Sequence, residues 1–230
     1  MSLAIRETRD EQMDSEDLPE VVYAEVLRDL GRINRLTLTA RPTLGFLKRA
    51  VGKRRQFTLL DVGFGEGGML RAIAGWASKR GIACDLTGID LNARSAAVAA
   101  AATAPDAPIR YLTGDYADLP GDYDLIVSSL VAHHMTSDQL RAFLRFMETR
   151  AAVGWFVGDL NRHAFAYHGF PLLARLARLH RIVREDGQLS IARSYRPQEW
   201  PPILAEADVP NGAARVFRCF PFRLCVERIR

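Results

Sequence analysis

The 230-residue sequence contains little cysteine and no long apolar run. Its three cysteines, Cys84, Cys219 and Cys225, show no metal-ligand spacing, and so small a number argues against a disulfide framework and favours a reducing compartment. No stretch approaches the roughly 18–20 apolar residues that a membrane helix requires. The N-terminus also lacks the charged and apolar segments of a secretory signal. We therefore expect a cytoplasmic protein without a metal site.

Positive charge is in slight excess, because 31 Lys and Arg residues stand against 27 Asp and Glu residues and leave a net charge of +4. Nucleic-acid binders usually concentrate positive charge on one face. The tight basic run Lys53-Arg54-Arg55 is interpreted as a solvated loop before a predicted strand. We expect no nucleic-acid partner, and nothing in the sequence indicates an oligomeric state.

Apolar runs of strand length alternate with segments of helical spacing over most of the chain. This alternation predicts a parallel, doubly wound sheet in an α/β protein. The predicted strands are 57–62, 83–89, 109–113, 123–130 and 152–160. Two further runs, 214–220 and 222–229, flank Pro221 and predict a hairpin. We expect a Rossmann-like, seven-stranded, mostly parallel sheet in one domain, with this hairpin as an antiparallel C-terminal edge.

A glycine-rich segment, Gly63-Phe64-Gly65-Glu66-Gly67-Gly68, lies between a predicted strand and a predicted helix. Glycines at such a place let the backbone approach a ligand closely. The segment also satisfies the G-x-G-x-x-G pattern of dinucleotide-binding proteins, so this motif alone leaves the cofactor open. Asp61, two residues before the first glycine, would repel a diphosphate. It suits S-adenosylmethionine, which carries an ammonium and a sulfonium group.

Acidic residues also follow the next two predicted strands. Asp90 can accept hydrogen bonds from both ribose hydroxyls, and Asp115, next to Tyr116, can accept one from the adenine amino group. A nicotinamide dehydrogenase shares the acid at the ribose but does not need the second, acid–aromatic pair. These positions together favour S-adenosylmethionine over a dinucleotide.

Four motifs, in order and at the family's spacing, resemble those of class I S-adenosylmethionine-dependent methyltransferases. They are Leu60-Asp61-Val62-Gly63-Phe64-Gly65-Glu66-Gly67, Gly88-Ile89-Asp90-Leu91, Gly114-Asp115-Tyr116-Ala117-Asp118-Leu119-Pro120 and Tyr123-Asp124-Leu125-Ile126-Val127-Ser128-Ser129. Phe64 departs from the family, which usually has a small residue or Cys there. The resemblance covers about Thr58 to Asp159 and implies methyl transfer with S-adenosylmethionine as cofactor.

The resemblance also implies a role for each motif position. Asp61 and Gly63 would line the methionine moiety, Asp90 would hold the ribose and Leu91 would pack on the adenine. Ser128 or Ser129 would face the sulfur end of the cofactor, and Arg35 is a candidate for its carboxylate. The expected cofactor-binding residues are Arg35, Asp61, Gly63, Gly65, Gly67, Asp90, Leu91, Asp115, Tyr116, Ser128 and Ser129.

His133 and His134 follow the fourth predicted strand, at the carboxyl end of the sheet, where ligands bind in such folds. A similar His-His pair recurs in small-molecule methyltransferases of the quinone-biosynthesis type. Either histidine can take the proton of an acceptor hydroxyl, although a packing role for each stays open. The preceding Ser128–Val131 segment lacks the Asn-Pro-Pro-Tyr run of amino-methylating enzymes, and no cysteine is near, as cytosine C5 enzymes require. Both classes are therefore disfavoured.

Two parts are added to the core that residues 57–230 contain. Residues 1–56 hold an acidic arm, 6–19, which we expect to be loosely packed, and helices that cover the cofactor site. An insertion at about 161–190 is expected to form a helical lid over a hydrophobic acceptor, or else a surface helix packed on the core. Its expected apolar face consists of Leu172, Leu173, Leu176, Leu179 and Val183. The opposite, basic face is a candidate for peripheral contact with membrane lipid and consists of Arg175, Arg178, Arg181 and Arg184.

Segments outside the core resemble a bacterial subgroup of methyltransferases that is associated with type III polyketide synthases. These segments are Glu11-x-Met13-Asp14, Asp29-Leu30-Gly31-Arg32-Ile33-Asn34-Arg35 and residues 185–195. The resemblance implies phenolic or pyrone lipids as acceptors. Tyr167, His168 and Arg193 are the candidates for contacts with the acceptor.

The leading hypothesis is O-methylation of a hydrophobic phenol-like or polyketide metabolite. C-methylation of a quinone-type ring is close to it, because the core motifs do not separate oxygen from carbon acceptors. Two hypotheses of other classes remain, which are a nicotinamide-dependent oxidoreductase and a protein that binds the cofactor without catalysis.

Overall fold

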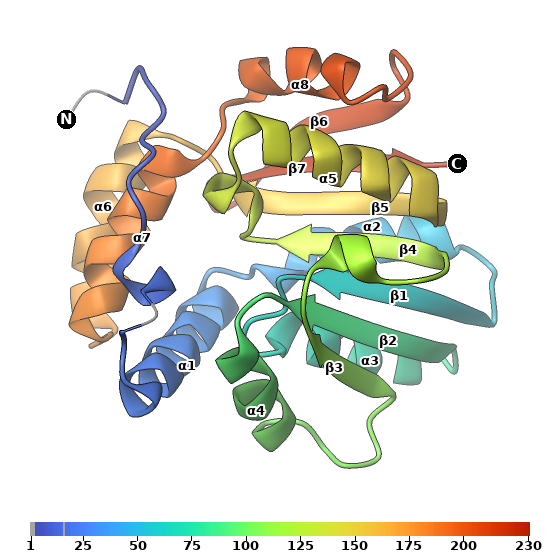
Figure 1. The fold of residues 1–230 in the computed structure, drawn as a ribbon, viewed down its shortest axis with the longest axis horizontal. Coiled ribbons are helices and arrows are strands. Elements are labelled where there is room, and N and C mark those ends of the chain that lie inside the picture. Colours follow the sequence, from blue (N-terminus) through green and yellow to red (C-terminus); the bar gives the residue numbers. More distant parts are fainter. Residues whose placement is uncertain (1–2, 16) are drawn as a thin grey trace.

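A seven-stranded sheet forms the centre of the computed structural model, which describes residues 3–15 and 17–230 (Figure 1). Met1, Ser2 and Glu16, which belong to the segment expected to cover the cofactor site, lie outside the described residues. The strands are β1 (Gln56–Val62), β2 (Ala83–Asp90), β3 (Ile109–Thr113), β4 (Tyr123–Ser129), β5 (Ala151–Leu160), β6 (Ala214–Cys219) and β7 (Arg223–Ile229).

The strand order is β3-β2-β1-β4-β5-β7-β6. The pairs from β3 to β5 are parallel, and β7 pairs antiparallel with both β5 and β6. The strand order reverses between β1 and β4, and ligands of doubly wound sheets bind outside the carboxyl ends of the strands at such a point. The predicted sheet is confirmed, including its antiparallel C-terminal edge.

Helices cover both faces of the sheet. They are α1 (Glu20–Leu36), α2 (Ala40–Val51), α3 (Gly68–Ser78), α4 (Ala93–Ala101), α5 (Ser137–Arg150), α6 (Ala164–Leu176), α7 (Arg181–Arg193) and α8 (Trp200–Glu206). One core joins a sheet face to α2 and α3, and another joins the opposite face to α5 and α8. Leu59 belongs to the first core and Leu60 to the second, because successive side chains of a strand point to opposite faces.

A third core lies beyond the carboxyl ends of the strands, where α1, α6 and α7 stand together (Figure 1). It is apolar and consists of Val26, Ile33, Ala174, Leu179, Ile182 and Val183. These three helices form a wall that faces the switch point between β1 and β4.

The lid, α6 and α7 together, differs from the single helix that the leucine spacing predicts. The chain leaves α6 after Leu176, takes a left-handed conformation at Arg178 (φ +52°) and begins α7 at Arg181, capped by the ring of His180. The prediction of one continuous apolar face was therefore wrong. Its members separate into buried Leu179 and Val183, cavity-lining Leu173, and exposed Leu172 and Leu176.

The acidic arm is not loosely packed, contrary to expectation. The Glu7 nitrogen donates to the Ala192 carbonyl at 3.1 Å, and the backbone nitrogens of Gln12 and Met13 donate to the two carboxylate oxygens of Asp186 at 3.1 and 2.9 Å. The arm thereby runs along α7 in Figure 1, and it carries a short 3-10 helix, Gln12–Asp14. These bonds bring residues from the start of the chain to the lid.

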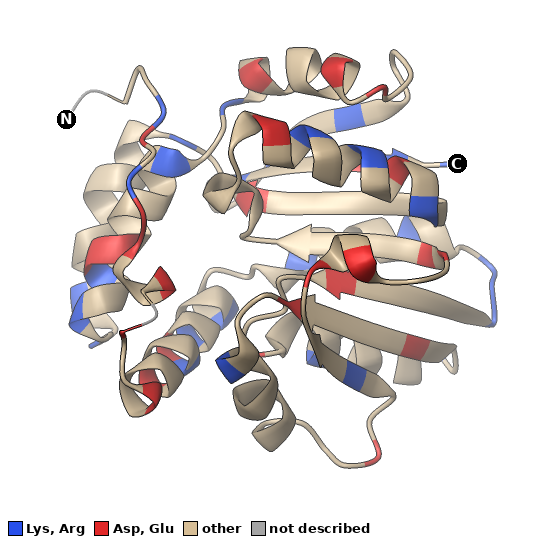
Figure 2. Ribbon diagram, viewed as in Figure 1, with Lys and Arg blue, Asp and Glu red and all other residues tan. Residues whose placement is uncertain are grey.

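Acidic and basic residues are interspersed over the elements in Figure 2. Among the described residues, no helix is both long and apolar enough to cross a membrane.

Candidate functional site

A cavity of about 1690 Å³ lies between the carboxyl ends of the central strands on one side and the wall of α1, α6 and α7 on the other. The arm also contributes to its lining. The glycine-rich loop after β1 and the ends of β2 and β4 line one side of it. The other side is largely apolar and is lined by Leu27, Leu30, Phe165, Phe170, Leu173 and Ile191. The cavity is continuous from the loop to the lid, so it can hold two ligands in contact.

The glycine-rich loop needs glycine for conformation and for space. Gly63 (φ +76°) and Gly67 (φ +75°) are left-handed, which side chains disfavour. A Cβ atom at Gly63 would overlap the Val131 side chain, and one at Gly67 would lie 2.5 Å from the Tyr111 hydroxyl. Gly63 and Gly65 line the cavity, whereas Gly67 packs behind it.

Asp61 is a carboxylate without a partner. Its side chain is buried at the end of β1, it lines the cavity, and neither carboxylate oxygen has a hydrogen bond. Burial, with a smaller contribution from the charge of Asp90, raises the pKa of Asp61 to about 7. A buried carboxylate in this state is stabilised by a cationic ligand, and the α-ammonium group of S-adenosylmethionine is one.

Asp90 connects β2 to the loop. Its Oδ2 accepts a hydrogen bond from the Gly65 nitrogen and its Oδ1 accepts one from the Asn92 nitrogen, both at 2.9 Å. Each oxygen keeps a lone pair for a hydroxyl of a ligand. Leu91 beside it is 77% exposed although it is apolar, and it lines the cavity. An apolar side chain left uncovered at a cavity edge is ready to pack on a flat ring.

The remaining predicted cofactor positions differ in where they lie. Tyr116 reaches the cavity while packing 4.9 Å from the rings of both Phe143 and Phe146, whereas Asp115 is exposed and caps the short 3-10 helix Tyr116–Asp118. Ser129 lines the cavity, but the buried Ser128 hydroxyl donates to the Val62 carbonyl at 2.9 Å and so joins β4 to β1. Arg35 is exposed in the last turn of α1, at the cavity margin.

His133 and His134 line the cavity and belong to the short 3-10 helix Ala132–His134 that follows β4. His133 is buried, and its Nδ1 lies 2.7 Å from Oδ1 of Asp159, at the end of β5. Although burial alone would raise the pKa of Asp159, the charge and hydrogen bond of His133 hold that pKa below its usual value. This contact uses Nδ1 of His133, so Nε2 is the ring nitrogen on the side of Glu11.

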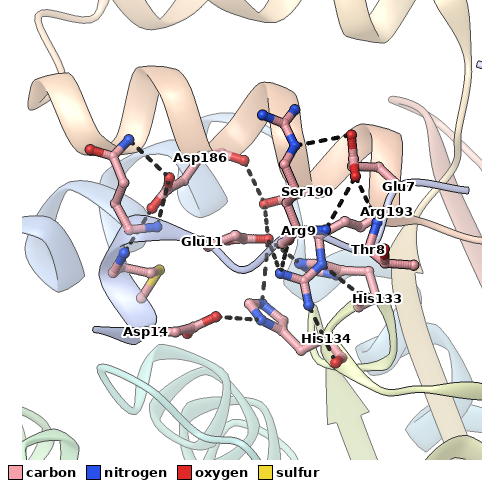
Figure 3. A network of polar contacts seen from close by, with 12 residues as sticks. Glu7, Thr8, Arg9, Glu11, Asp14, His133, His134, Asp186, Ser190 and Arg193 are labelled. Atoms are coloured by element: carbon pink, nitrogen blue, oxygen red, sulfur yellow. Dashed lines mark hydrogen bonds and ion pairs between the residues drawn. The ribbon is translucent and has the colours of Figure 1, made fainter. Parts of the chain in front are cut away.

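The arm adds a carboxylate to the histidine pair, as Figure 3 shows. Glu11 is buried, and its Oε1 lies 3.6 Å from His133 Nε2 and 3.9 Å from His134 Nε2. Burial raises the pKa of Glu11 to about 7, against the opposing charge of His134. The three ligand atoms lie within 4.8 Å of one another, which is close enough for a metal ion. No sequence spacing indicates this cluster, because Glu11 is remote from the histidines along the chain.

The candidates for acceptor contacts lie outside the cavity lining. Tyr167 faces the opposite side of the lid, next to Gln188, and exposed His168 packs against the Tyr167 ring. Arg193 is buried behind the histidines and donates to the carbonyls of Arg9, His133 and His134. It holds the backbone under the histidine pair and reaches within 3.9 Å of Glu11.

Sequence reasoning did not single out Asp159 or Arg223 as site residues. Arg223, the first residue of β7, is buried at the cavity and donates to the hydroxyls of Thr37 and Thr39 at 2.8 and 2.6 Å. Its Nε and Nη1 have no partner, and burial lowers its pKa to about 10. Asp159 could have been predicted, because it stands at the end of a predicted strand, as Asp90 does. Arg223 carried none, because it stands in an edge hairpin.

A family model described as a methyltransferase domain matches residues 59–154. No curated protein sequence matches the chain. The matched segment contains the four motifs and ends within β5, before the lid.

Several solved structures share the fold. The plantazolicin methyltransferase BpumL, solved with SAH, has a TM-score of 0.64 at 15% identity, over 92% of this chain and 95% of its own. Human N-acetylserotonin methyltransferase (ASMT), solved with SAM, has a TM-score of 0.63 at 14% identity, over 92% of this chain and 56% of its own. Magnesium protoporphyrin IX methyltransferase (ChlM) from Synechocystis PCC 6803, solved with SAH, has a TM-score of 0.56 at 14% identity, over 95% of this chain and 91% of its own.

Proposed function

The chain is a class I, S-adenosylmethionine-dependent methyltransferase, and we propose that it methylates a hydroxyl of a hydrophobic phenol-like or polyketide molecule. One observation carries the proposal. A single cavity joins the unpartnered carboxylate of Asp61 to the buried His133, whose Nδ1 is held by Asp159. The cofactor and the acceptor can therefore meet without crossing solvent.

The residues around the loop fit the cofactor. Asp61 binds the α-ammonium group, Asp90 accepts hydrogen bonds from the ribose hydroxyls, and Leu91 packs on the adenine with Tyr116 beyond it. Arg35, at the cavity margin, pairs with the carboxylate. Residues 1–56 cover the bound cofactor, since α1 lines the cavity opposite the loop. The bound cofactor supplies a methyl group that its sulfonium activates for displacement.

Proton transfer is the task of this chain's own residues. Asp159 orients His133, and Nε2 of His133 takes the proton of the acceptor hydroxyl as the oxygen attacks the methyl carbon. The positive charge that forms on the His133 ring is stabilised by the carboxylate of Glu11, whose Oε1 lies 3.6 Å from Nε2. A phenol has an ordinary pKa near 10, so its attack on the methyl group gains from a base at this position.

The apolar lining supports a hydrophobic acceptor. Phe165, Phe170 and Leu173 of α6 face the cavity from the lid. Outside the cavity lining, α6 exposes Leu172 and Leu176, and Arg175 and Arg178 near them are also exposed. We propose that this outer face touches an anionic membrane surface, from which a lipid-like acceptor enters.

Transfer of a labelled methyl group tests the function. The protein is incubated with bacterial lipid extract and methyl-labelled S-adenosylmethionine, and products are analysed by mass spectrometry. Labelled methyl ether supports the proposal, and label on a ring carbon favours C-methylation of a quinone-type ring. Binding of SAH without transfer to any extract favours a non-catalytic protein. Binding of NAD in place of SAH would contradict the cofactor itself.

A further inference from the structure

The cluster that Glu11, His133 and His134 form has the chemistry of a transition-metal site. Two imidazoles and one carboxylate are a ligand set that Zn²⁺ accepts readily, whereas Mg²⁺ prefers oxygen alone. The three side chains come from two remote parts of the chain, the arm and the 3-10 helix after β4. All three line the cavity, so a cation there would keep a coordination position open to a ligand.

Both histidines are prepared for metal binding by a second carboxylate. Nδ1 of His133 lies 2.7 Å from Asp159, and Nδ1 of His134 lies 3.1 Å from Asp14. Each bond fixes the ring proton on Nδ1 and turns Nε2 toward Glu11 (Figure 3). Metal-binding histidines show this arrangement almost without exception, because the outer carboxylate orients the ring and makes it more basic.

The distances agree with a cation among the three atoms. Donors about 2.1 Å from a tetrahedral Zn²⁺ stand about 3.4 Å from one another. Oε1 of Glu11 is 3.6 Å from His133 Nε2 and 3.9 Å from His134 Nε2. The three ligand atoms all lie within 4.8 Å of one another, so the rings and the carboxylate must draw closer together to hold the ion. Ser190 already fixes Glu11, donating to Oε1 at 2.9 Å.

The charges around the cluster favour a cation. Three carboxylates, those of Glu11, Asp14 and Asp159, surround the two rings. Two guanidinium groups, those of Arg6 and Arg193, also lie at the cluster. Both donate to backbone carbonyls, and Nη1 of Arg193 lies 3.9 Å from Oε1 of Glu11. A cation therefore shares the carboxylates with Arg193, and its binding depends on the two imidazole nitrogens together with Glu11.

We propose that Glu11, His133 and His134 bind one Zn²⁺ or a similar transition-metal ion. We further propose that the bound ion inhibits methyl transfer, and this inhibitory role rests on the proposed function. It occupies Nε2 of His133, the atom that takes the acceptor proton. Metal and acceptor proton then compete for one lone pair, and the cluster acts as an inhibitory site.

The test measures zinc alone. Metal-free protein is titrated with Zn²⁺ by calorimetry, and bound metal is counted after gel filtration. We expect about one ion per chain and a loss of affinity of at least about tenfold in Glu11→Gln, His134→Ala and Asp14→Asn. His168→Ala, which removes an exposed histidine outside the cluster, should bind zinc as the unchanged protein does.

Absence of stoichiometric zinc, or equal affinity in all variants, overturns the proposal. Stabilisation of each variant by SAH checks that it is folded, and partly exposed Asp14 gives a variant that leaves the buried core intact. Zinc binding does not depend on methyl transfer, so failure of the function leaves this result readable. Zinc bound without loss of methyl transfer would overturn the inhibitory role, and with it the assignment of His133 as the base.

Discussion

Asp159 holds His133 by two hydrogen bonds at once, accepting one from the ring at Nδ1 (2.7 Å) and one from the backbone nitrogen (2.8 Å). The two bonds use different oxygens of one buried carboxylate. They fix the position of the ring, and the proposed proton acceptor is therefore Nε2.

Asp159→Asn tests this relationship. An amide can donate to Nδ1 and favour the wrong tautomer, so we predict that kcat falls at least about 100-fold. The affinity for SAH should stay unchanged, because Asp159 lies away from the loop. His133→Ala should lower kcat by a similar factor, and adding this change to Asp159→Asn should cost little more. Unchanged kcat in Asp159→Asn would remove His133 from the mechanism.

Asp90 and Asp115 form a matched pair for the cofactor. Asp90 is fixed by two backbone nitrogens at the cavity, whereas Asp115 is exposed and caps a 3-10 turn. We predict that Asp90→Ala weakens SAH binding at least tenfold, a loss of about 1.4 kcal/mol, and that Asp115→Ala weakens it less. Calorimetric titration with SAH measures both. Equal affinities in the two variants would contradict the ribose assignment.

Asp61 gives cofactor binding a pH dependence. Its pKa lies at about 7 in the empty protein, above the ordinary value of 3.8, so the folded state holds a proton that the unfolded state releases. Stability of the empty protein should therefore fall as the pH rises from about 4 to 7. A ligand ammonium pairs with the ionised form, so the stabilisation by SAH should grow over the same range.

Thermal unfolding with and without SAH from about pH 5 to 8 measures this effect. Asp61→Asn should give a smaller stabilisation that no longer depends on pH. Glu11, whose pKa is also raised to about 7, is the control, because Glu11→Gln should keep the dependence. A pH dependence that survives in Asp61→Asn would assign the titration to another group.

We predict that the buried guanidinium of Arg223 lowers the free energy of unfolding of the protein. Burial leaves two of its nitrogens without partners, while Thr37 and Thr39 keep other hydrogen-bond partners if the guanidinium is removed. We expect Arg223→Met to raise the free energy of unfolding by about 1 kcal/mol. Arg215→Met, at a mostly exposed arginine on β6, should change it by less than about 0.5 kcal/mol. Urea unfolding measures both variants. If Arg223→Met is clearly less stable than the unchanged protein, the charge of Arg223 is stabilised by its surroundings and the prediction is wrong.

The outer face of α6 predicts membrane binding. Leu172 and Leu176 of α6 are 62% and 74% exposed and lie outside the cavity lining. Sedimentation with phosphatidylglycerol vesicles should carry the protein down, and changing both leucines to Asp should reduce the bound fraction at least about fivefold. Leu112→Asp, at another exposed leucine, on β3, is the control and should bind as the unchanged protein does. Equal binding of the unchanged protein, the double leucine variant and Leu112→Asp would exclude α6 as the membrane contact.

The cofactor half of the site was predictable because parallel strands end at one edge. Once β1, β2 and β4 were recognised, Asp61, Asp90 and His133 had to lie near one another, whatever the side chains between them. The predicted Ser128 shows the limit of this reasoning. Its place in the motif does not reveal that its hydroxyl points into the sheet and bonds to Val62.

The acceptor half depends on packing between remote segments. Glu11 reaches the histidines because Asp186 holds the backbone of Gln12 and Met13, and no local pattern encodes that contact. The break of the lid lies at Arg178, a left-handed residue that is neither Gly nor Asn. The leucine spacing continues through it, so periodicity alone joined two helices into one.

The segments that form the wall of the cavity are not part of the segment that carries the four motifs. Arm, α1 and lid all lie outside residues 59–154, yet they supply the apolar lining and Glu11. Exchange of these segments with those of a related protein is therefore expected to change the proposed acceptor preference while the glycine-rich loop and the proposed cofactor site stay as they are.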